Sequence, residues 1–267
     1  MKMLLSALIG FSIWSAPALA CGPTTDCVIG DRIYRIKMPD GHDGVTPVGA
    51  VVHAHGYRGT ANGTIKGMTW MASKLGVALI APKSKHADWV IPGAPGKTHV
   101  DGSAEFEYFD AMIADASARF PIDRNRLMAS GFSAGGMMVW NLACHRGGLF
   151  AAYAPVAGTF WTPVPARCPS GPVSMIHMHG KNDRTVPLNG RRIADTKQGE
   201  VLRALDLFRR TGGFQPKNRS TFEELTCERS VNAAGQISEF CLHDGAHNVK
   251  SRWLIRAWRE FEKLGAL

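Results

Sequence analysis

The sequence has little of what marks fibrous, disordered or membrane-spanning proteins. Its 29 glycines and 15 prolines in 267 residues follow no collagen-like or linker period. Beyond residue 20, no apolar run approaches the ~20 residues that cross a bilayer. The net charge is +9, yet no Lys/Arg run reaches five residues and no aromatic platform accompanies the basic residues. We therefore expect neither nucleic acid nor a membrane as a stable partner.

The first 20 residues are typical of a secretory signal peptide. Met1-Lys2 precedes a short apolar stretch, and Pro17 to Ala20 forms a small-x-small cleavage sequence. We expect cleavage near Ala20, export, and a mature chain of residues 21–267. A lipid anchor on Cys21 is not expected, because Ala18 stands where the lipid-attachment motif has a large apolar residue.

The six cysteines all follow this cleavage site. An even number in an exported protein predicts disulfides rather than reactive thiols. Six cysteines allow 15 pairings, so the sequence alone does not determine the connectivity. Proximity along the chain favours Cys21 with Cys27, Cys144 with Cys168, and Cys227 with Cys241.

Short β-branched runs alternate with longer helical stretches, which predicts an α/β fold with a mostly parallel, doubly wound sheet flanked by helices. Several predicted strands are almost continuously apolar, as strands buried on both faces are. No repeat or linker divides the chain, so we expect one domain, 21–267, without a large cap. The predicted strands are 33–38, 50–55, 77–81, 126–130, 152–157 and 173–179, with two further strands at 222–227 and 236–242 around a turn. The predicted helices are 64–75, 104–119, 134–145, 200–211 and 249–264.

One segment carries a clear chemical signal. An apolar strand runs into Gly131-Phe132-Ser133-Ala134-Gly135 and then into a helix, which is the context of a nucleophile elbow. The glycines two before and two after Ser133 remove side chains that would clash at such a sharp turn. The helix N-terminus directs N–H groups and a favourable dipole at a developing oxyanion. We predict Ser133 as a nucleophile and the Ala134 N–H as an oxyanion donor.

A serine nucleophile needs a base oriented by a carboxylate. Asp183 follows an apolar strand, and His247 lies in a short loop between the last predicted strand and helix. The chain order Ser133, Asp183, His247 is that of the α/β-hydrolase fold. Asp244 is a rival acid, but it lies only three residues before His247, so we favour Asp183. The loop after 50–55 supplies a second oxyanion donor, predicted as the Tyr57 backbone N–H.

Two histidine pairs suggest a metal site at first sight. His53-x-His55 and His177-x-His179 each place two imidazoles on one face of a strand. A catalytic zinc site needs a further ligand and an open position. The serine elbow accounts for the chemistry without a metal, so we expect neither metal nor cofactor. His55 and His179 each precede a glycine at a strand end, where we expect them to hold loops by hydrogen bonds.

These residues resemble the secreted polyhydroxybutyrate depolymerase-like esterases, which are related to feruloyl and acetylxylan esterases of the α/β-hydrolase superfamily. The resemblance implies the same roles for Ser133, Asp183 and His247. One departure concerns the residues after His247, where Asn248-Val249-Lys250 replaces the Trp-Pro pair of many relatives. The resemblance spans 55–59, 88–93, 131–136, 158–161, 179–187 and 245–247.

The resemblance implies a secreted serine hydrolase that cleaves carboxylic esters. The favoured substrates are polyesters or oligoesters of 3-hydroxybutyrate. A feruloyl or acetylxylan esterase is the alternative. A non-catalytic binding protein and a peptidase of the same fold are further alternatives. Trp89 and Trp161 follow strands on the side where such sheets bind ligands, so they are candidates for substrate contact as well as for shielding the core.

Overall fold

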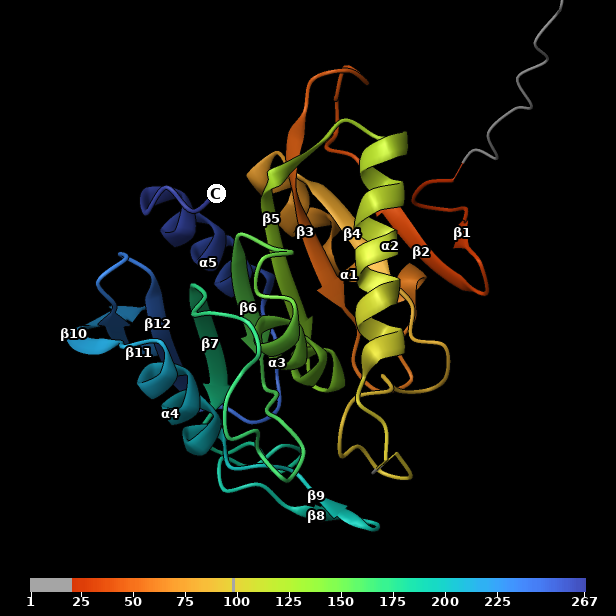
Figure 1. The fold of residues 1–267 in the computed structure, drawn as a ribbon. Helices are drawn as coiled ribbons and strands as arrows, with labels where there is room; N and C mark the ends of the chain where they lie inside the picture. The colour runs from red at the N-terminus through yellow and green to blue at the C-terminus, as the bar shows by residue number, and fades with distance from the viewer. Residues whose placement is uncertain (1–20, 98) are drawn as a thin grey trace, which may run out of the picture.

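The computed structural model describes residues 21–97 and 99–267, and the predicted signal peptide lies outside the described residues. A ten-stranded sheet with helices on both faces forms the molecule (Figure 1). The strands are β1 (Cys27–Ile29), β2 (Arg32–Lys37), β3 (Val48–Ala54), β4 (Ala78–Pro82), β5 (Ile122–Phe132), β6 (Ala152–Val156), β7 (Met175–Gly180), β8 (Arg192–Ile193), β9 (Thr196–Lys197), β10 (Gln215–Phe222), β11 (Leu225–Val231) and β12 (Ile237–His243). The helices are α1 (Ala61–Leu75), α2 (Ser103–Arg119), α3 (Ala134–His145), α4 (Val201–Thr211) and α5 (Ser251–Lys263).

The centre of the sheet is parallel and its two edges are antiparallel. The strand order is β1-β2-β4-β3-β5-β6-β7-β12-β11-β10, and the pairs from β4 to β12 are parallel. At the edges β2 joins β4, and β11 joins β12, in antiparallel pairs. Burial of whole strands such as β4, β6 and β7 explains their continuous apolar character. The predicted doubly wound α/β domain is confirmed.

Four of the helices bury one apolar face against this sheet, whereas α3 is buried on almost all sides. Side chains of α2, α3 and α4 belong to one core cluster, and those of α1 and α5 belong to the other. In α5 the apolar residues recur at helical spacing, and Trp253, Leu254, Ala257, Trp258 and Phe261 are all fully buried. Among the described residues, no helix has the length and apolar character needed to cross a membrane.

The carboxyl-terminal strands required a correction. The predicted strand 222–227 is two strands, because β10 ends at Phe222 and β11 begins at Leu225 after a two-residue turn. Glu223 has a φ of 50° in this turn. Glycine often occupies such a position and marks the turn in a sequence, but here there is no glycine. Most of β10 was not predicted, because this edge strand is almost entirely exposed and lacks an apolar pattern. The predicted hairpin turn near Gly235 is confirmed between β11 and β12.

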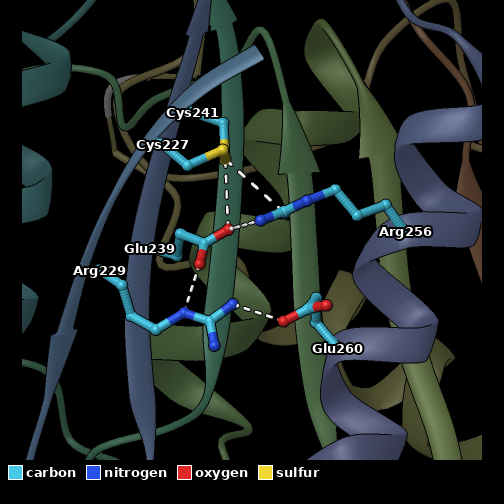
Figure 2. Close-up of a disulfide and its surroundings, with 6 residues drawn as sticks. All are labelled: Cys227, Arg229, Glu239, Cys241, Arg256 and Glu260. Atoms are coloured by element: carbon cyan, nitrogen blue, oxygen red, sulfur yellow. Dashed lines mark hydrogen bonds and ion pairs between the residues drawn. A yellow bond between two sulfur atoms is a disulfide. The ribbon is translucent and has the colours of Figure 1, made fainter. Parts of the chain in front are cut away.

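All three predicted disulfides are present: Cys21–Cys27, Cys144–Cys168 and Cys227–Cys241. Figure 2 shows the third, which joins directly opposite residues of β11 and β12. Beside it the buried Glu239 accepts hydrogen bonds from Arg229 and Arg256, at 2.6 Å for the Arg256 contact. Because the two sulfurs are bonded to each other, neither offers a thiolate to a metal ion near Glu239.

Glu224 connects the β10–β11 turn to the start of α5. Its carboxylate accepts hydrogen bonds from Lys250 at 2.6 Å, from Arg252 at 3.0 Å and from the Trp253 indole at 2.9 Å. Burial raises the pKa of Glu224, but these bonds outweigh it and lower the pKa from 4.5 to about 2. The contact therefore anchors the helix that follows the His247 loop.

This shift predicts a pH-dependent contribution to stability. A carboxyl with a depressed folded-state pKa stabilises the fold above its unfolded pKa and loses that contribution as the pH falls through the folded value. We expect Glu224→Gln to lower the free energy of unfolding at pH near 7, with the deficit vanishing between pH 4.5 and about 2. Urea unfolding of both proteins across this pH range measures the difference in the free energy of unfolding. Glu107→Gln, at an exposed position, is the matched control. A deficit that persists at the acid end contradicts the prediction.

Candidate active site

Ser133 lies in the sharp turn between β5 and α3. Its backbone has φ 58° and ψ −121°, a conformation that side-chain-bearing residues rarely adopt. Two hydrogen bonds hold this turn: the Ser133 N–H donates to Val156 O at 3.0 Å, and the Met137 N–H donates to Ser133 O at 2.9 Å. Ser133 is half-buried at the first turn of α3. The predicted elbow geometry is confirmed.

The glycines around Ser133 are required by close backbone approaches. A Cβ on Gly131 would lie 2.3 Å from Gly135 O, and a Cβ on Gly135 would lie 2.0 Å from Ala54 O. A Cβ on Gly136 would lie 2.5 Å from Val156 O. These approaches let α3 pack directly on the ends of β3 and β6, so Ser133 is held at the carboxyl edge of the sheet.

Gly135 offers a direct test of this packing. We expect Gly135→Ala to lower the free energy of unfolding by about 3 kcal/mol or more, because a methyl group 2.0 Å from the backbone oxygen of Ala54 forces the helix and strand apart. Chemical denaturation of the two proteins measures the change. Gly148→Ala is the matched control, since nothing lies within 4 Å of a Cβ there. Equal free energies of unfolding for both variants would contradict the prediction, because the helix would then shift without loss of stability.

Asp183 and His247 are brought together although 64 residues separate them. The His247 Nδ1–H donates to Asp183 Oδ2 at 2.6 Å. The other carboxylate oxygen accepts the backbone N–H groups of Thr185 and Val186, each at 2.8 Å. Burial raises the pKa of Asp183, but these three hydrogen bonds to its charged form outweigh burial, so the pKa lies below its ordinary value. The carboxylate is thus charged and fixed in orientation.

The His247 loop packs tightly on the end of β7. A Cβ on Gly180 would lie 2.4 Å from Ala246 O, so the loop approaches the strand without an intervening side chain. The His247 ring packs on Phe132, with ring centroids 4.6 Å apart, which places it beside the residue preceding Ser133. Among residues 21–97 and 99–267, no hydrogen bond joins Ser133 to His247. In free enzymes such bonds are often long and shorten only with substrate bound.

Asp244, the rival acid, faces solvent. Its side chain is 88% exposed and pairs with Lys181 at 2.8 Å. The hydrogen bond from His247 goes to Asp183 instead. The geometry therefore favours Asp183 as the partner of His247.

Two backbone N–H groups flank Ser133 as oxyanion candidates. Ala134 is the first residue of α3, so its N–H has no acceptor within the helix. Tyr57 follows Gly56, and a Cβ on Gly56 would lie 3.5 Å from the Ser133 Cβ, so this loop lies against the elbow. In the described part of the chain, the Tyr57 N–H donates to no other backbone group. Both predicted donors are therefore next to the candidate nucleophile.

In the first histidine pair, His55 holds two loops and His53 joins two neighbouring strands. His55 Nδ1 bonds Gly56 O at 2.7 Å, and its Nε2 accepts the Ser84 N–H at 3.1 Å. His53 Nδ1 lies 3.1 Å from Ser130 Oγ. Burial lowers the pKa of both His53 and His55 to about 4, so both are neutral at pH 7. The predicted loop-holding role of His55 is confirmed.

The second histidine pair supports the Asp183 loop. His177 Nε2 and His179 Nδ1 are 3.0 Å apart and hydrogen-bonded to each other. His179 Nε2 bonds Val186 O at 2.8 Å and lies 3.6 Å from Asp183 Oδ2. Burial lowers the pKa of both imidazoles. The predicted role of His179 is confirmed, because it holds the residue whose N–H binds Asp183.

A cavity of about 460 Å³ opens beside Ser133. Trp89 and Trp161 both contribute to its wall, although the first is fully buried and the second is only 5% exposed. The Trp89 indole donates to His55 O at 2.9 Å, so it also braces the loop that carries Tyr57. Sequence analysis gave no site role to several other wall residues, because no catalytic motif assigns them one. These are Asp88, Ala94, Pro95, Lys97, Met137, Thr185, Val186, Arg191, Ile193 and Gln198. Asp88, Thr185 and Val186 lie in segments that carry the family resemblance, and Met137 lies in α3.

No protein-family model matches this chain. Among curated proteins it is similar to a probable feruloyl esterase C of Aspergillus terreus, with 26% identity over 264 residues that cover 92% of this chain and 90% of that protein. Feruloyl esterase D of Neurospora crassa is 27% identical over 278 residues, covering 94% and 88%. Feruloyl esterase C of Emericella nidulans is 30% identical over 171 residues, covering 61% and 58%.

Solved structures agree on the architecture. The acetyl xylan esterase from Aspergillus awamori superposes with a TM-score of 0.62 at 16% identity, covering 94% of this chain and 98% of that one. Esterase PE8 gives 0.52 at 18% identity, covering 82% and 94%. The fold is that of an α/β-hydrolase. Together with the esterases among the curated relatives, the comparisons support a carboxylic ester hydrolase.

Proposed function

We propose that the protein is an exported serine hydrolase that cleaves carboxylic esters through an acyl-enzyme. The observation that carries this proposal is the 2.6 Å contact between Asp183 and His247 beside the strained Ser133 turn. Export is supported by three disulfides, which persist in oxidising compartments.

The contact between Asp183 and His247 determines which nitrogen acts as the base. Because Nδ1 carries the proton donated to Asp183, Nε2 is free to accept the proton of Ser133 as its oxygen attacks the ester carbonyl. The N–H groups of Ala134 and Tyr57 stabilise the oxyanion of the tetrahedral intermediate. His247 then protonates the leaving alcohol, and a water molecule activated by the same nitrogen releases the acyl group.

We propose an aromatic acyl group, such as feruloyl, rather than a hydroxybutyrate chain. The relatives are named for feruloyl esters, which favours the alternative over the polyhydroxybutyrate specificity implied by the sequence resemblance. The cavity supports this choice, because Trp89 and Trp161 form part of its wall and aromatic rings pack well against one another. The remaining apolar wall residues, such as Met137 and Ile193, suit the same group.

A panel of esters tests both parts of the proposal. Methyl ferulate, 4-nitrophenyl acetate and the methyl ester of a hydroxybutyrate trimer are offered to the mature protein, and a fluorophosphonate probe is added to a parallel sample. We expect methyl ferulate to give the highest kcat/KM and the probe to modify the peptide that contains Ser133. A higher kcat/KM for the trimer would restore the polyester specificity. If no ester is hydrolysed and no peptide is modified, the protein is a binding protein instead.

A further inference from the structure

Two basic side chains line the catalytic cavity, and two more line a cavity beside it. Lys97 and Arg191 contribute to the same wall as Ser133. Arg192 and Lys197 line a neighbouring cavity of about 450 Å³. Arg192 and Lys197 belong to the β8–β9 hairpin, which lies beyond the carboxyl ends of the central strands (Figure 1). The basic residues thus lie in the wall of the catalytic cavity and beside it.

In the described chain, none of these four cations has a carboxylate within 4.0 Å. Elsewhere many basic side chains are paired, as Arg32 is with Glu105 at 2.8 Å and Arg146 with Asp110 at 2.8 Å. Arg192 and Lys197 stand directly opposite each other across the β8–β9 pair. Like charges at such positions repel. The fold therefore leaves these four cations without an ion pair in the described chain. Two carboxyl groups are nearby: Asp195 lines the neighbouring cavity, and Lys97 acts to lower the pKa of Asp88.

The two cations that line the catalytic cavity are on anchored loops. The Arg191 Nε–H donates to Thr185 O at 2.7 Å, and this bond orients the guanidinium group. Within residues 21–97 and 99–267, its two Nη groups have no hydrogen-bond partner and are free for a ligand. The loop of Lys97 is tied to the β8–β9 turn, because the Gly96 N–H donates to Asp195 at 3.3 Å. A guanidinium with two free Nη groups matches the two oxygens of a carboxylate.

Among the residues that the structure describes, Asp88 is the one acidic residue in the wall of the catalytic cavity. Asp88 accepts its hydrogen bond from the Trp89 N–H at 2.8 Å, and burial raises the pKa of its carboxyl. The same wall contains two basic residues, Lys97 and Arg191. The balance of charge at the cavity is therefore positive.

We propose that this cavity selects esters that carry a carboxylate close to the scissile bond, with Arg191 and Lys97 as the residues that bind it. This inference rests on the proposed ester hydrolysis and specifies its substrate class. The carboxylate lies on either the acyl or the alcohol part of the ester. Positive charge around a cleft with apolar walls raises the local concentration and the association rate of an anionic substrate.

Matched ester pairs test this selectivity. For the acyl part, monoethyl succinate is compared with ethyl methyl succinate, and release of ethanol is measured. For the alcohol part, the 3-hydroxybutyrate dimer is compared as the free acid and as its methyl ester. The proteins are the wild type, the double variant Lys97→Gln/Arg191→Gln, and a control, Lys74→Gln/Arg124→Gln. The control removes the same charge from exposed positions in the last turn of α1 and the first half of β5.

We expect the wild type to favour the acid by about tenfold or more in kcat/KM in at least one pair. The control keeps this ratio, and the Lys97/Arg191 variant loses most of it. Raising the ionic strength from about 0.01 to about 1 M shortens the screening length from about 30 to about 3 Å and reduces the wild-type ratio. The pair that responds identifies the side of the ester that bears the carboxylate. Equal ratios in all three proteins overturn the proposal.

A binding measurement separates this proposal from that of ester hydrolysis. In the Ser133→Ala background, calorimetry compares binding of the dimer acid and its methyl ester. Tighter binding of the acid that disappears with Lys97→Gln/Arg191→Gln supports the carboxylate site even if no ester is hydrolysed. Equal affinities for acid and methyl ester overturn the site even if other esters are hydrolysed.

Discussion

Replacing Ser133 with alanine is expected to lower the kcat/KM for ester hydrolysis by about 10⁶-fold, which corresponds to about 8 kcal/mol of transition-state stabilisation. The loss is large because the acyl-enzyme route needs an attacking oxygen, and the Ala134 and Tyr57 N–H groups can then assist only a bound water molecule. Hydrolysis of methyl ferulate is measured for both proteins, over hours for the variant. The two rates give the ratio of the kcat/KM values.

The fold should tolerate this change. Alanine differs from serine by one oxygen, and the backbone hydrogen bonds of Ser133 to Val156 and Met137 involve main-chain atoms that alanine retains. Thermal unfolding of the variant is expected to match the wild type within a few degrees. Ser73→Ala, at an exposed position in the last turn of α1, is the matched control for activity. A folded Ser133→Ala protein with more than a tenth of wild-type activity would exclude Ser133 as the nucleophile.

The sequence predicted the elbow well because its requirements are local. A strand, a glycine, the serine, another glycine and a helix follow one another within a short segment, and each glycine has a steric reason that the structure confirms. The parallel strands were predicted for a similar reason, since burial on both faces leaves an unbroken apolar run. The order of Ser133, Asp183 and His247 along the chain indicates the fold without any knowledge of long-range contacts.

The residues that shape the substrate cavity had no comparable signal. Lys97 and Arg191 lie in irregular loops, and their proximity depends on how the loop that contains Gly96 and Lys97 meets the β8–β9 hairpin. Edge strand β10 was missed because its exposed side chains follow no apolar alternation. Trp89 illustrates the intermediate case: its place after a strand suggested a cavity wall, but its complete burial and its bond to His55 depend on tertiary packing.

Asp183→Asn is expected to lower kcat by about 10⁴-fold while leaving the nucleophile and its elbow in place. The reason is the direction of the hydrogen bonds around residue 183. One carboxylate oxygen accepts the N–H groups of Thr185 and Val186, so the amide oxygen of asparagine takes that position. The amide NH₂ group then faces His247 Nδ1. In the wild type, the carboxylate oxygen at this place accepts a hydrogen bond from the Nδ1–H.

This reversal changes the tautomer of His247. With an NH₂ donor opposite it, Nδ1 must be an acceptor, so the proton moves to Nε2 and the base can no longer take the proton of Ser133. The opposite amide orientation would set NH₂ against two backbone N–H donors and is disfavoured. Asp244→Asn is the matched control, because Asp244 is exposed and pairs with Lys181 rather than with His247. Steady-state kinetics of the two variants decide between the acids: a loss confined to Asp183→Asn supports the assignment, and a loss confined to Asp244→Asn reverses it.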